Sequence, residues 1–206
     1  MKRCVMACLW AVAVAGIVAA GEFNAERNIG DDAPAWKALP GTDGKQHSLA
    51  DLKDKDAVIV VFTCNSCEVA TDYEDRIIAF SKKHAAPGSK VALVAINVNK
   101  IPADSLEKMK ERAKSKGFPF PYLFDETQKI AKDYGAAFTP EFFVLDKARK
   151  IAYMGSMDDN SDAATAKEHY LEDALAAVLE GKKVSKTETN AIGCRIRFAR
   201  EKRKSE

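Results

Sequence analysis

The stretch VVFTCNSCEVATDYEDRI, residues 60–77, places two cysteines three positions apart between an apolar run and a charged, helix-like segment. Cys64 follows the apolar run directly, and Cys67 directly precedes the charged segment. Such a pair is a redox-active dithiol, one half of a metal site, or two buried thiols that happen to be neighbours. The rest of the sequence is needed to choose among the three.

The first residues predict the cellular compartment, which affects how cysteines are interpreted. Lys2 and Arg3 precede an uncharged run over residues 4–20 that ends in small residues, a pattern typical of an export signal cleaved after Ala20. The run is longer than the ~7–15 residues of an ordinary signal core, so an uncleaved membrane anchor is the alternative. We therefore expect an exported, periplasmic protein, anchored to the inner membrane if the signal is retained.

The number of cysteines that remain after cleavage favours cysteine chemistry over structural stapling. Removal of residues 1–20 leaves three of the five cysteines, Cys64, Cys67 and Cys194. A small domain stapled by disulfides would carry an even and denser set. One close pair of cysteines with one remote thiol is more typical of a redox-active dithiol.

The charge balance gives no indication of a polyanion as partner of the main body. The full chain has 32 basic and 30 acidic residues, and two of the basic ones lie in the predicted signal. Nothing here suggests a nucleic-acid partner. Residues 195–206, RIRFAREKRKSE, are predominantly basic and are interpreted as a solvated tail, with contact to acidic lipid headgroups or to a partner protein as the alternative.

Apolar runs and amphipathic segments alternate along the chain, which predicts one α/β domain whose mixed central sheet is flanked by helices. Two short β-branched runs, 58–63 and 91–98, are typical of strands covered on both faces. Apolar residues at helical spacing over 69–80 predict a helix between them. Asp104 is expected to cap the next helix. The further elements expected are helices at 104–117, 125–135 and 163–180 and a β-hairpin at 142–154.

In this order of elements the cysteine pair lies at the carboxyl end of a central strand, where the chain enters a helix. Sites in open α/β sheets gather at such strand ends, and the N–H groups of a helix N-terminus stabilise a thiolate. We expect Cys64 to be the more exposed and more acidic thiol and to attack a partner disulfide. Cys67 would then resolve the mixed disulfide.

Several segments resemble the thioredoxin fold and, more narrowly, its redoxin branch of peroxiredoxin-like and alkyl hydroperoxide reductase/thiol-specific antioxidant (AhpC/TSA) relatives. The resemblance extends from Gly30 to Gly181 and rests on the C-x-x-C after VIVVF, on Thr139-Pro140 before EFFVL, and on GKQHSLADL ahead of the first core strand. The chain also resembles exported bacterial thioredoxin-like proteins, in TCNSCEVATDYEDRI, KGFPFPYLFDETQ, TPEFFVLD and a late Gly193-Cys194.

The resemblance implies a domain at 21–181 with an N-terminal extension, followed by a C-terminal arm and basic tail at 182–206. It implies an enzyme that reduces or exchanges disulfides in protein substrates, uses no cofactor or metal, and is rereduced by a membrane or exported electron donor. It also implies a cis peptide bond between Thr139 and Pro140, in a loop that lies against the cysteine pair and offers backbone groups to a peptide.

The sequence departs from thioredoxin at positions that affect redox chemistry. Asn65 and Ser66 stand between the cysteines, where thioredoxin has Gly-Pro. The strand at 58–63 contains no carboxylate, whereas thioredoxin keeps a buried acid there that assists proton transfer. The reduction potential and the direction of exchange are therefore not predicted.

A thiol peroxidase is one alternative. When the P-x-x-x-T-x-x-C pattern of peroxiredoxins is aligned on Cys67, Cys64 falls on the threonine and Val60 on the proline. Both groups that shape a peroxide pocket are thus missing, which disfavours this alternative.

A metal-binding or copper-delivery protein is a second alternative, and a binding module with a vestigial pair is a third. Copper-delivery proteins of this fold use C-x-x-x-C with a histidine near the proline loop, and the chain has neither. Its three histidines, His47, His84 and His169, lie on polar stretches or in the N-terminal segment. We therefore expect no metal site.

Cys194 admits two interpretations. As a small buried side chain it would pin the arm onto the domain. As a third redox thiol it would be carried back to the pair by the arm after Gly181, and we expect a disulfide with Cys64 in that case.

Overall fold

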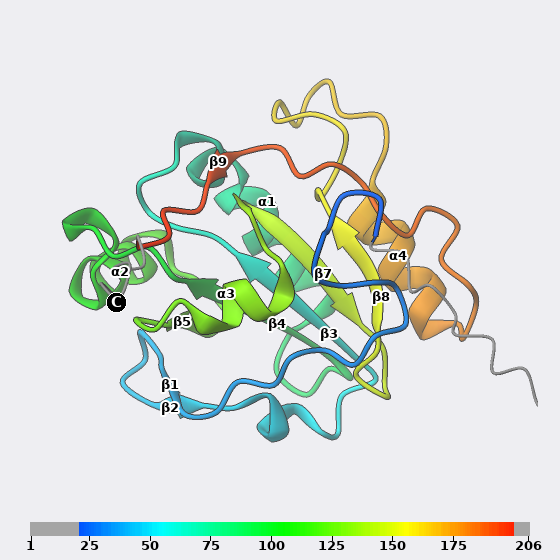
Figure 1. Cartoon of the computed structure of the whole chain (residues 1–206), viewed down its shortest axis with the longest axis horizontal. Helices are drawn as coiled ribbons and strands as arrows, with labels where there is room; N and C mark the ends of the chain where they lie inside the picture. The colour runs from blue at the N-terminus through cyan, green and yellow to red at the C-terminus, as the bar shows by residue number, and fades with distance from the viewer. Residues whose placement is uncertain (1–20, 200–206) are drawn as a thin grey trace, which may run out of the picture.

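The computed structural model describes residues 21–199 and contains a five-stranded mixed sheet (Figure 1). The strand order is β5-β4-β3-β7-β8, with β4 parallel to β3 and β5, and with β7 antiparallel to β3 and β8. The strands are β3 (Ala57–Phe62), β4 (Val91–Asn97), β5 (Tyr122–Phe124), β7 (Glu141–Leu145) and β8 (Ile151–Gly155). The expected α/β thioredoxin fold is confirmed, and the predicted strands and hairpin are all present.

Within the described part of the chain, four α-helices flank the sheet: α1 (Glu68–His84), α2 (Leu106–Lys116), α3 (Lys129–Tyr134) and α4 (Tyr170–Leu179). The central strand β3 lies between two apolar clusters because its side chains alternate between the faces of the sheet. On one face Ile59 and Val61 pack with Tyr73 of α1 and with α4. On the other face Val60 packs with Tyr134 of α3. The six residues of β3 are 0% exposed.

Short elements complete the fold. The N-terminal segment pairs β1 (Leu39–Pro40) with β2 (Gln46–His47), and β6 (Phe138–Thr139) pairs with β9 (Cys194–Arg195). Two 3-10 helices, η1 (Leu49–Leu52) and η2 (Pro102–Asp104), lie before β3 and after β4.

Three predicted helix starts are wrong. The helix expected from Asp125 begins at Lys129, because Asp125 accepts the backbone N–H of Thr127 at 2.9 Å and the residues before Lys129 form a turn. The helix expected from Asp104 begins at Leu106 with Ser105 as its capping residue, while Asp104 belongs to η2. The helix expected from residue 163 begins at Tyr170, because carboxylates accept the preceding backbone N–H groups: Asp162 binds the N–H of Ala164 at 2.9 Å, and Asp159 binds those of Lys167 and Glu168 at 2.8 and 3.1 Å. The predicted helix ends are confirmed, since Gly117 and Gly135 follow α2 and α3 with φ of 64° and 69°.

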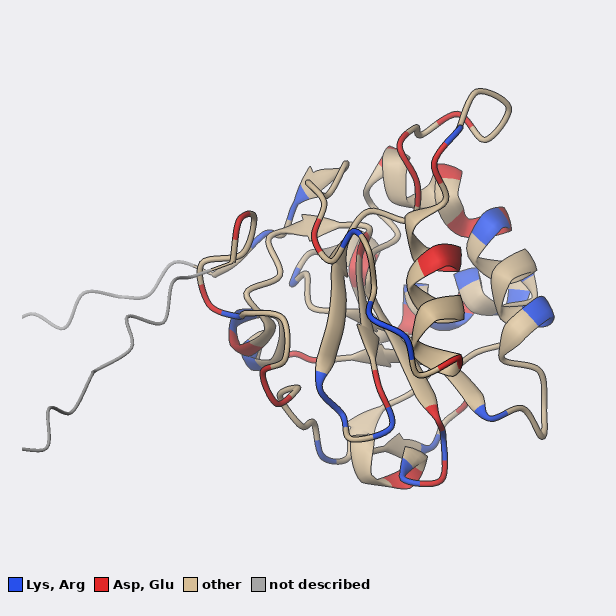
Figure 2. Cartoon of the chain, turned by 90° about the vertical axis from the view of Figure 1, so that its right-hand side faces the viewer, with Lys and Arg blue, Asp and Glu red and all other residues tan. Residues whose placement is uncertain are grey.

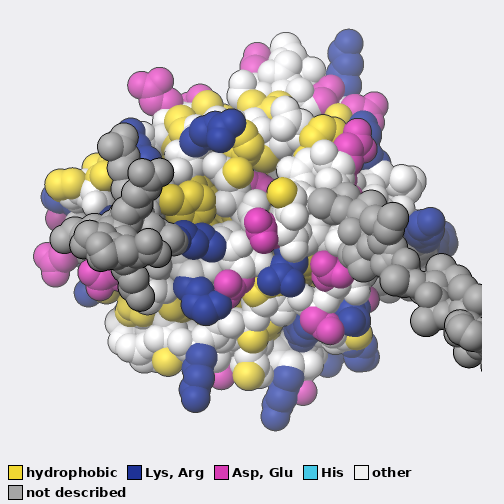
Figure 3. Space-filling model, in the orientation of Figure 1, with side chains coloured by type: hydrophobic (Ala, Val, Ile, Leu, Met, Phe, Trp, Pro, Cys, Tyr) yellow, Lys and Arg dark blue, Asp and Glu magenta, His cyan; other side chains and the backbone are white. Residues whose placement is uncertain are grey.

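Charged residues of both signs are interspersed along the helices and loops (Figure 2), and their side chains are interspersed over the face seen in Figure 3. Within residues 21–199 no helix combines the length and the apolar character needed to cross a membrane. The predicted signal at 1–20 and the end of the basic tail at 200–206 lie outside the described residues.

Candidate functional site

The cysteine pair lies between the end of β3 and the start of α1. Cys67 is the capping residue of α1, and its Sγ accepts the N–H of Ala70 at 3.4 Å. An N–H group at a helix N-terminus stabilises negative charge on the atom that accepts it. Cys67 therefore occupies the position that was expected for Cys64.

Both thiols of the pair are buried, and both are free. Cys64 is 4% exposed and Cys67 is 2% exposed. Burial raises the pKa of Cys64 above its usual value; the hydrogen bond with Thr139 lowers it, and the charge of Asp104 raises it further. Cys64 is thus slightly more exposed than Cys67, as expected, but it is buried rather than open to solvent, because neighbouring segments cover it. The expectation that its pKa is lowered is wrong, since burial raises it.

The proline loop lies directly against both sulfurs. The Thr139-Pro140 peptide bond is cis, as expected. The Sγ of Cys64 lies 3.4 Å from Oγ1 of Thr139, and the Sγ of Cys67 donates to the carbonyl oxygen of Thr139 at 3.2 Å. The structure thus brings together four of the predicted site residues, while the role of the loop in binding a peptide remains a prediction.

Asp104 is a site residue that the sequence analysis missed. Its side chain is 0% exposed and accepts the backbone N–H groups of Asn65 and Ser66 at 2.7 and 3.1 Å. It also accepts the hydroxyl of Ser66 at 2.6 Å, and that hydroxyl lies 3.7 Å from the Sγ of Cys64. Asp104 therefore shapes the turn between the cysteines and connects Cys64 to a buried carboxylate.

The strand at 58–63 contains no acid, and the buried carboxylate at this site comes from η2 instead. The sequence signal was ambiguous, because an aspartate followed three residues later by Glu107 is a common helix-capping pattern. Its contact with Ser66 joins residues 38 positions apart and follows from the parallel pairing of β3 with β4.

Cys194 completes a group of three thiols. Strand β9 pairs antiparallel with β6, so that Cys194 lies opposite Thr139. The pKa of Cys194 is raised to about 11, first by its hydrogen bond with Cys67, then by partial loss of hydration and by the charges of the two other thiolates; the N–H of Val69 lowers it. Cys194 is exposed, so the interpretation of a buried packing residue is wrong.

The histidines lie in other contacts. His47 is 3.0 Å from the carboxylate of Asp43, and His84 is 2.7 Å from that of Glu172. His169 is exposed and immediately precedes α4. Among residues 21–199 no group of three or more His, Cys, Asp or Glu side chains is arranged to hold a metal ion.

Comparison with known proteins places this site in a family. The family model described as AhpC/TSA matches residues 29–154. The chain belongs to the AhpC/TSA family. No match was found among the curated proteins.

Solved structures agree with this assignment. A hypothetical protein from Sinorhizobium meliloti 1021 is 36% identical, with a TM-score of 0.77 and coverage of 84% of this chain and 96% of that chain. An uncharacterized conserved protein from Geobacillus kaustophilus is 35% identical, with a TM-score of 0.78 and coverage of 85% and 94%. A putative protein disulfide isomerase from Bacteroides thetaiotaomicron is 26% identical, with a TM-score of 0.59 and coverage of 74% and 91%. This AhpC/TSA protein thus shares its fold with a group of thioredoxin-like proteins.

The contact of Asp104 with the cysteine turn generates a prediction about the pKa of Cys64. Because the charge of Asp104 raises that pKa, Asp104→Asn should lower it, while the amide can still fill the space of the carboxyl. The measurement is thiolate absorbance against pH, extended into the alkaline range, in a protein that also carries Cys67→Ser and Cys194→Ser, so that Cys64 is the only thiol left at the site. An unchanged or higher pKa in the Asp104→Asn variant would contradict the electrostatic account.

Glu141 generates a second prediction. Its buried carboxyl accepts the N–H groups of Ala137 and Phe138 at 2.8 and 2.9 Å, and burial raises its pKa from 4.5 to about 7. The folded state therefore binds this proton more tightly than the unfolded state, so the stabilisation is fully present below pH 4.5 and is lost as the pH rises through about 7.

Glu141→Gln should remove this part of the pH dependence. Chemical denaturation of both proteins between pH 4 and 8 should show the free energy of unfolding of the wild type falling relative to the variant, by up to about 3 kcal/mol. Parallel curves over this range would show that Glu141 does not titrate as described.

Proposed function

We propose that the protein is an exported thiol–disulfide oxidoreductase in which Cys64 and Cys67 alternate between a dithiol and a disulfide. The observation that carries the proposal is the contact of both sulfurs with Thr139, beside a cis proline and at the N-terminus of α1. The two residues between the cysteines allow a disulfide across one turn of the chain. Support also comes from the AhpC/TSA family and from the relative described as a putative protein disulfide isomerase.

In the reducing direction the pair transfers two electrons to a client disulfide. One cysteine thiolate attacks a client sulfur and expels the other client sulfur as a thiolate. The second cysteine then attacks the mixed disulfide and forms the Cys64–Cys67 disulfide, and the client leaves with two thiols that take up the protons lost by the cysteines. The Ser66 hydroxyl and the Asp104 carboxylate form a path by which a proton leaves Cys64.

The proposed location is the periplasm, with protein disulfides as substrates and a membrane or exported dithiol as electron donor. The support for this location is the signal-like pattern of residues 1–20. A donor is needed because each turnover leaves the pair oxidised.

A thiol peroxidase is the second candidate, favoured by the AhpC/TSA family and by the N–H group that Cys67 accepts at the start of α1. In that reaction the Cys67 thiolate would attack a peroxide oxygen, and water and a sulfenic acid would form. Cys64 and Val60 stand where a peroxide pocket has threonine and proline, so we place this candidate second.

The two candidates predict opposite results in a paired assay. With dithiothreitol as donor, the protein should reduce insulin much faster than it reduces hydrogen peroxide. Cys64→Ser and Cys67→Ser should each lower the rate of insulin reduction by about a hundredfold or more, because neither variant can form the disulfide of the pair. Ser115→Ala, on the exposed end of α2, is the control and should keep the wild-type rate.

Rapid peroxide reduction that survives Cys64→Ser and is lost in Cys67→Ser would overturn the proposal in favour of the peroxidase. Equal rates of insulin reduction by the wild type and both cysteine variants would show that the pair has no part in disulfide exchange.

A further inference from the structure

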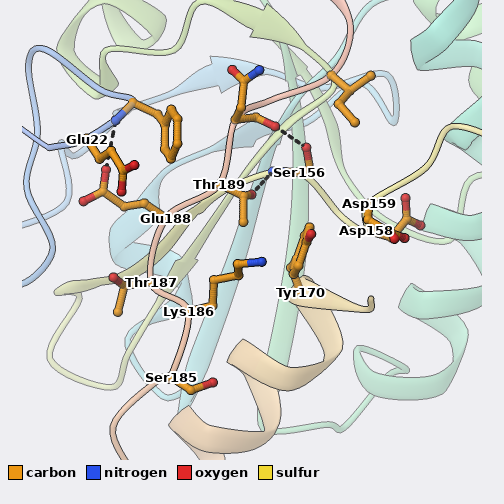
Figure 4. A pocket seen from close by; sticks show the side chains of 13 residues that line it. Glu22, Ser156, Asp158, Asp159, Tyr170, Ser185, Lys186, Thr187, Glu188 and Thr189 are labelled. Carbon is orange, nitrogen blue, oxygen red and sulfur yellow. Dashed lines mark hydrogen bonds between the residues drawn. The ribbon is translucent and has the colours of Figure 1, made fainter. Parts of the chain in front are cut away.

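The C-terminal arm is fixed along the edge of the sheet before it reaches the thiols. The N–H of Met154 in β8 donates to the carbonyl of Thr187 at 3.0 Å, and the N–H of Thr189 donates to the carbonyl of Met154 at 3.1 Å. Ser156 adds two hydrogen bonds, from its N–H to the Thr189 hydroxyl at 2.9 Å and from its hydroxyl to the Asn190 carbonyl at 2.7 Å (Figure 4). From there the arm runs past the start of α1 to β9 (Figure 1).

Beyond the thiols the arm is fixed again. The N–H of Arg197 donates to the side chain of Asn99 at 2.9 Å, and Gln128 donates to the Arg197 carbonyl at 2.9 Å. The N–H of Ala199 donates to the side chain of Gln128 at 2.7 Å. The segment that carries Cys194 is therefore held on both sides rather than left free.

At the thiols the arm approaches the proline loop more closely than any side chain would allow. A Cβ atom on Gly193 would lie 2.0 Å from the carbonyl oxygen of Thr139 and 3.1 Å from the nitrogen of Pro140. Only glycine permits this approach, since the clashing atoms belong to the backbone. The backbone of β9 thus occupies the edge of β6, where an extended peptide would otherwise pair.

The arm leaves one of the three sulfurs accessible. Cys64 and Cys67 are buried, whereas Cys194 is exposed. Cys194 lies opposite Thr139 in the pairing of β9 with β6, and the carbonyl oxygen of the same Thr139 accepts the thiol of Cys67 at 3.2 Å. Cys194 also lies at the N-terminus of α1, beside the N–H of Val69. A partner protein therefore meets Cys194 before it meets either member of the pair.

We propose that Cys194 is the surface thiol through which the protein exchanges disulfides with its partners. The disulfide of the buried pair is converted to a Cys67–Cys194 disulfide, and partner thiols and disulfides then react with Cys194. This inference rests on the proposed redox role of Cys64 and Cys67. It also revises the expected pairing, since Cys67 rather than Cys64 is the partner of Cys194.

The exchange is balanced without any further oxidant or reductant. In the oxidised protein the Cys194 sulfur attacks Cys67 of the Cys64–Cys67 disulfide; the Cys67–Cys194 disulfide forms, and Cys64 leaves and takes the proton that Cys194 lost. A thiolate of a partner dithiol then attacks Cys194, and Cys67 leaves. The second partner thiol attacks the mixed disulfide, so that the partner becomes oxidised and Cys194 returns to a thiol. Two electrons have passed from the partner to the protein, and the same steps in reverse reduce a client disulfide.

The environment of Cys67 favours the step in which a partner thiolate attacks Cys194. Cys67 leaves in that step, and its sulfur is stabilised by the N–H of Ala70 at the start of α1. The pKa of Cys194 is raised in part by Cys67 and Cys64 in their reduced forms, and this obstacle to attack by Cys194 is absent once the pair is a disulfide.

The first test is disulfide mapping after mild oxidation with a limiting amount of oxidised glutathione. Cys64→Ser should form Cys67–Cys194 at least about tenfold faster than Cys67→Ser forms Cys64–Cys194. Adding Gly193→Ala to the Cys64→Ser protein should slow the formation of Cys67–Cys194 by about tenfold or more, because the arm can no longer dock on Thr139. Ile192→Ala, its exposed neighbour, is the matched control and should have no effect. Faster formation of Cys64–Cys194, or no effect of Gly193→Ala, would overturn the assignment.

The second test is the rate at which reduced thioredoxin, a protein too large to enter a buried site, rereduces the oxidised Cys194→Ser protein in the absence of any other disulfide substrate, followed by alkylation of the thiols that appear. The rate should fall by about tenfold or more, while the Cys64–Cys67 disulfide still forms with a small oxidant. A rate equal to or above that of the wild type would overturn the proposal and show that the arm merely covers the pair. Since Cys64→Ser and Cys67→Ser would still be inactive in insulin reduction in that outcome, it is distinguishable from a failure of the proposed function.

Discussion

The complete burial of β3 between β4 and β7 determines where the chemistry of this protein takes place. Because the strand is buried on both faces, the chain leaves the sheet only at the carboxyl end of β3, and there it enters α1. The parallel partner β4 ends beside it and delivers η2, whose Asp104 binds the turn between the cysteines. The antiparallel partner β7 begins with the proline loop, whose Thr139 contacts both sulfurs. Three elements therefore converge on one point because each is joined to the same strand or to its neighbours.

The electrostatic environment of the thiols is a balance between burial and polar contacts. Burial and the charge of Asp104 favour the neutral thiol of Cys64, whereas the hydrogen bond with Thr139 favours its thiolate. Cys67 accepts a helix N–H, and Cys194 is held as a thiol by the sulfur next to it. A site arranged in this way keeps the pair away from solvent and leaves one sulfur where a partner reaches it. In the proposed exchange, access to the pair, rather than the acidity of one exposed cysteine, selects the partner.

Much of the fold was predictable from the sequence, because it depends on local patterns. Three local patterns each predict one kind of element: the apolar run at 58–63 predicts a strand, the apolar spacing of α1 predicts a helix, and the glycines after α2 and α3 predict helix ends. The cis bond at Thr139-Pro140 followed from the family resemblance rather than from the residues themselves. The exposure of Cys64 was mispredicted because it depends on the proline loop and on an arm more than 100 residues away. Asp104 was missed for the same reason, since the capping pattern is local whereas its contacts with Asn65 and Ser66 are not.

The most direct test of the central claim is redox titration of a Cys194→Ser protein that comprises residues 21–206, in which Cys64 and Cys67 are the two remaining cysteines. The protein is equilibrated in glutathione buffers of increasing oxidation at pH 7, alkylated and weighed by mass spectrometry. The account predicts one two-electron transition in which both cysteines lose their label together, and its disappearance when Cys64→Ser is added. Labelling of both cysteines throughout the titration would contradict the account, because the pair would then not be a reversible disulfide.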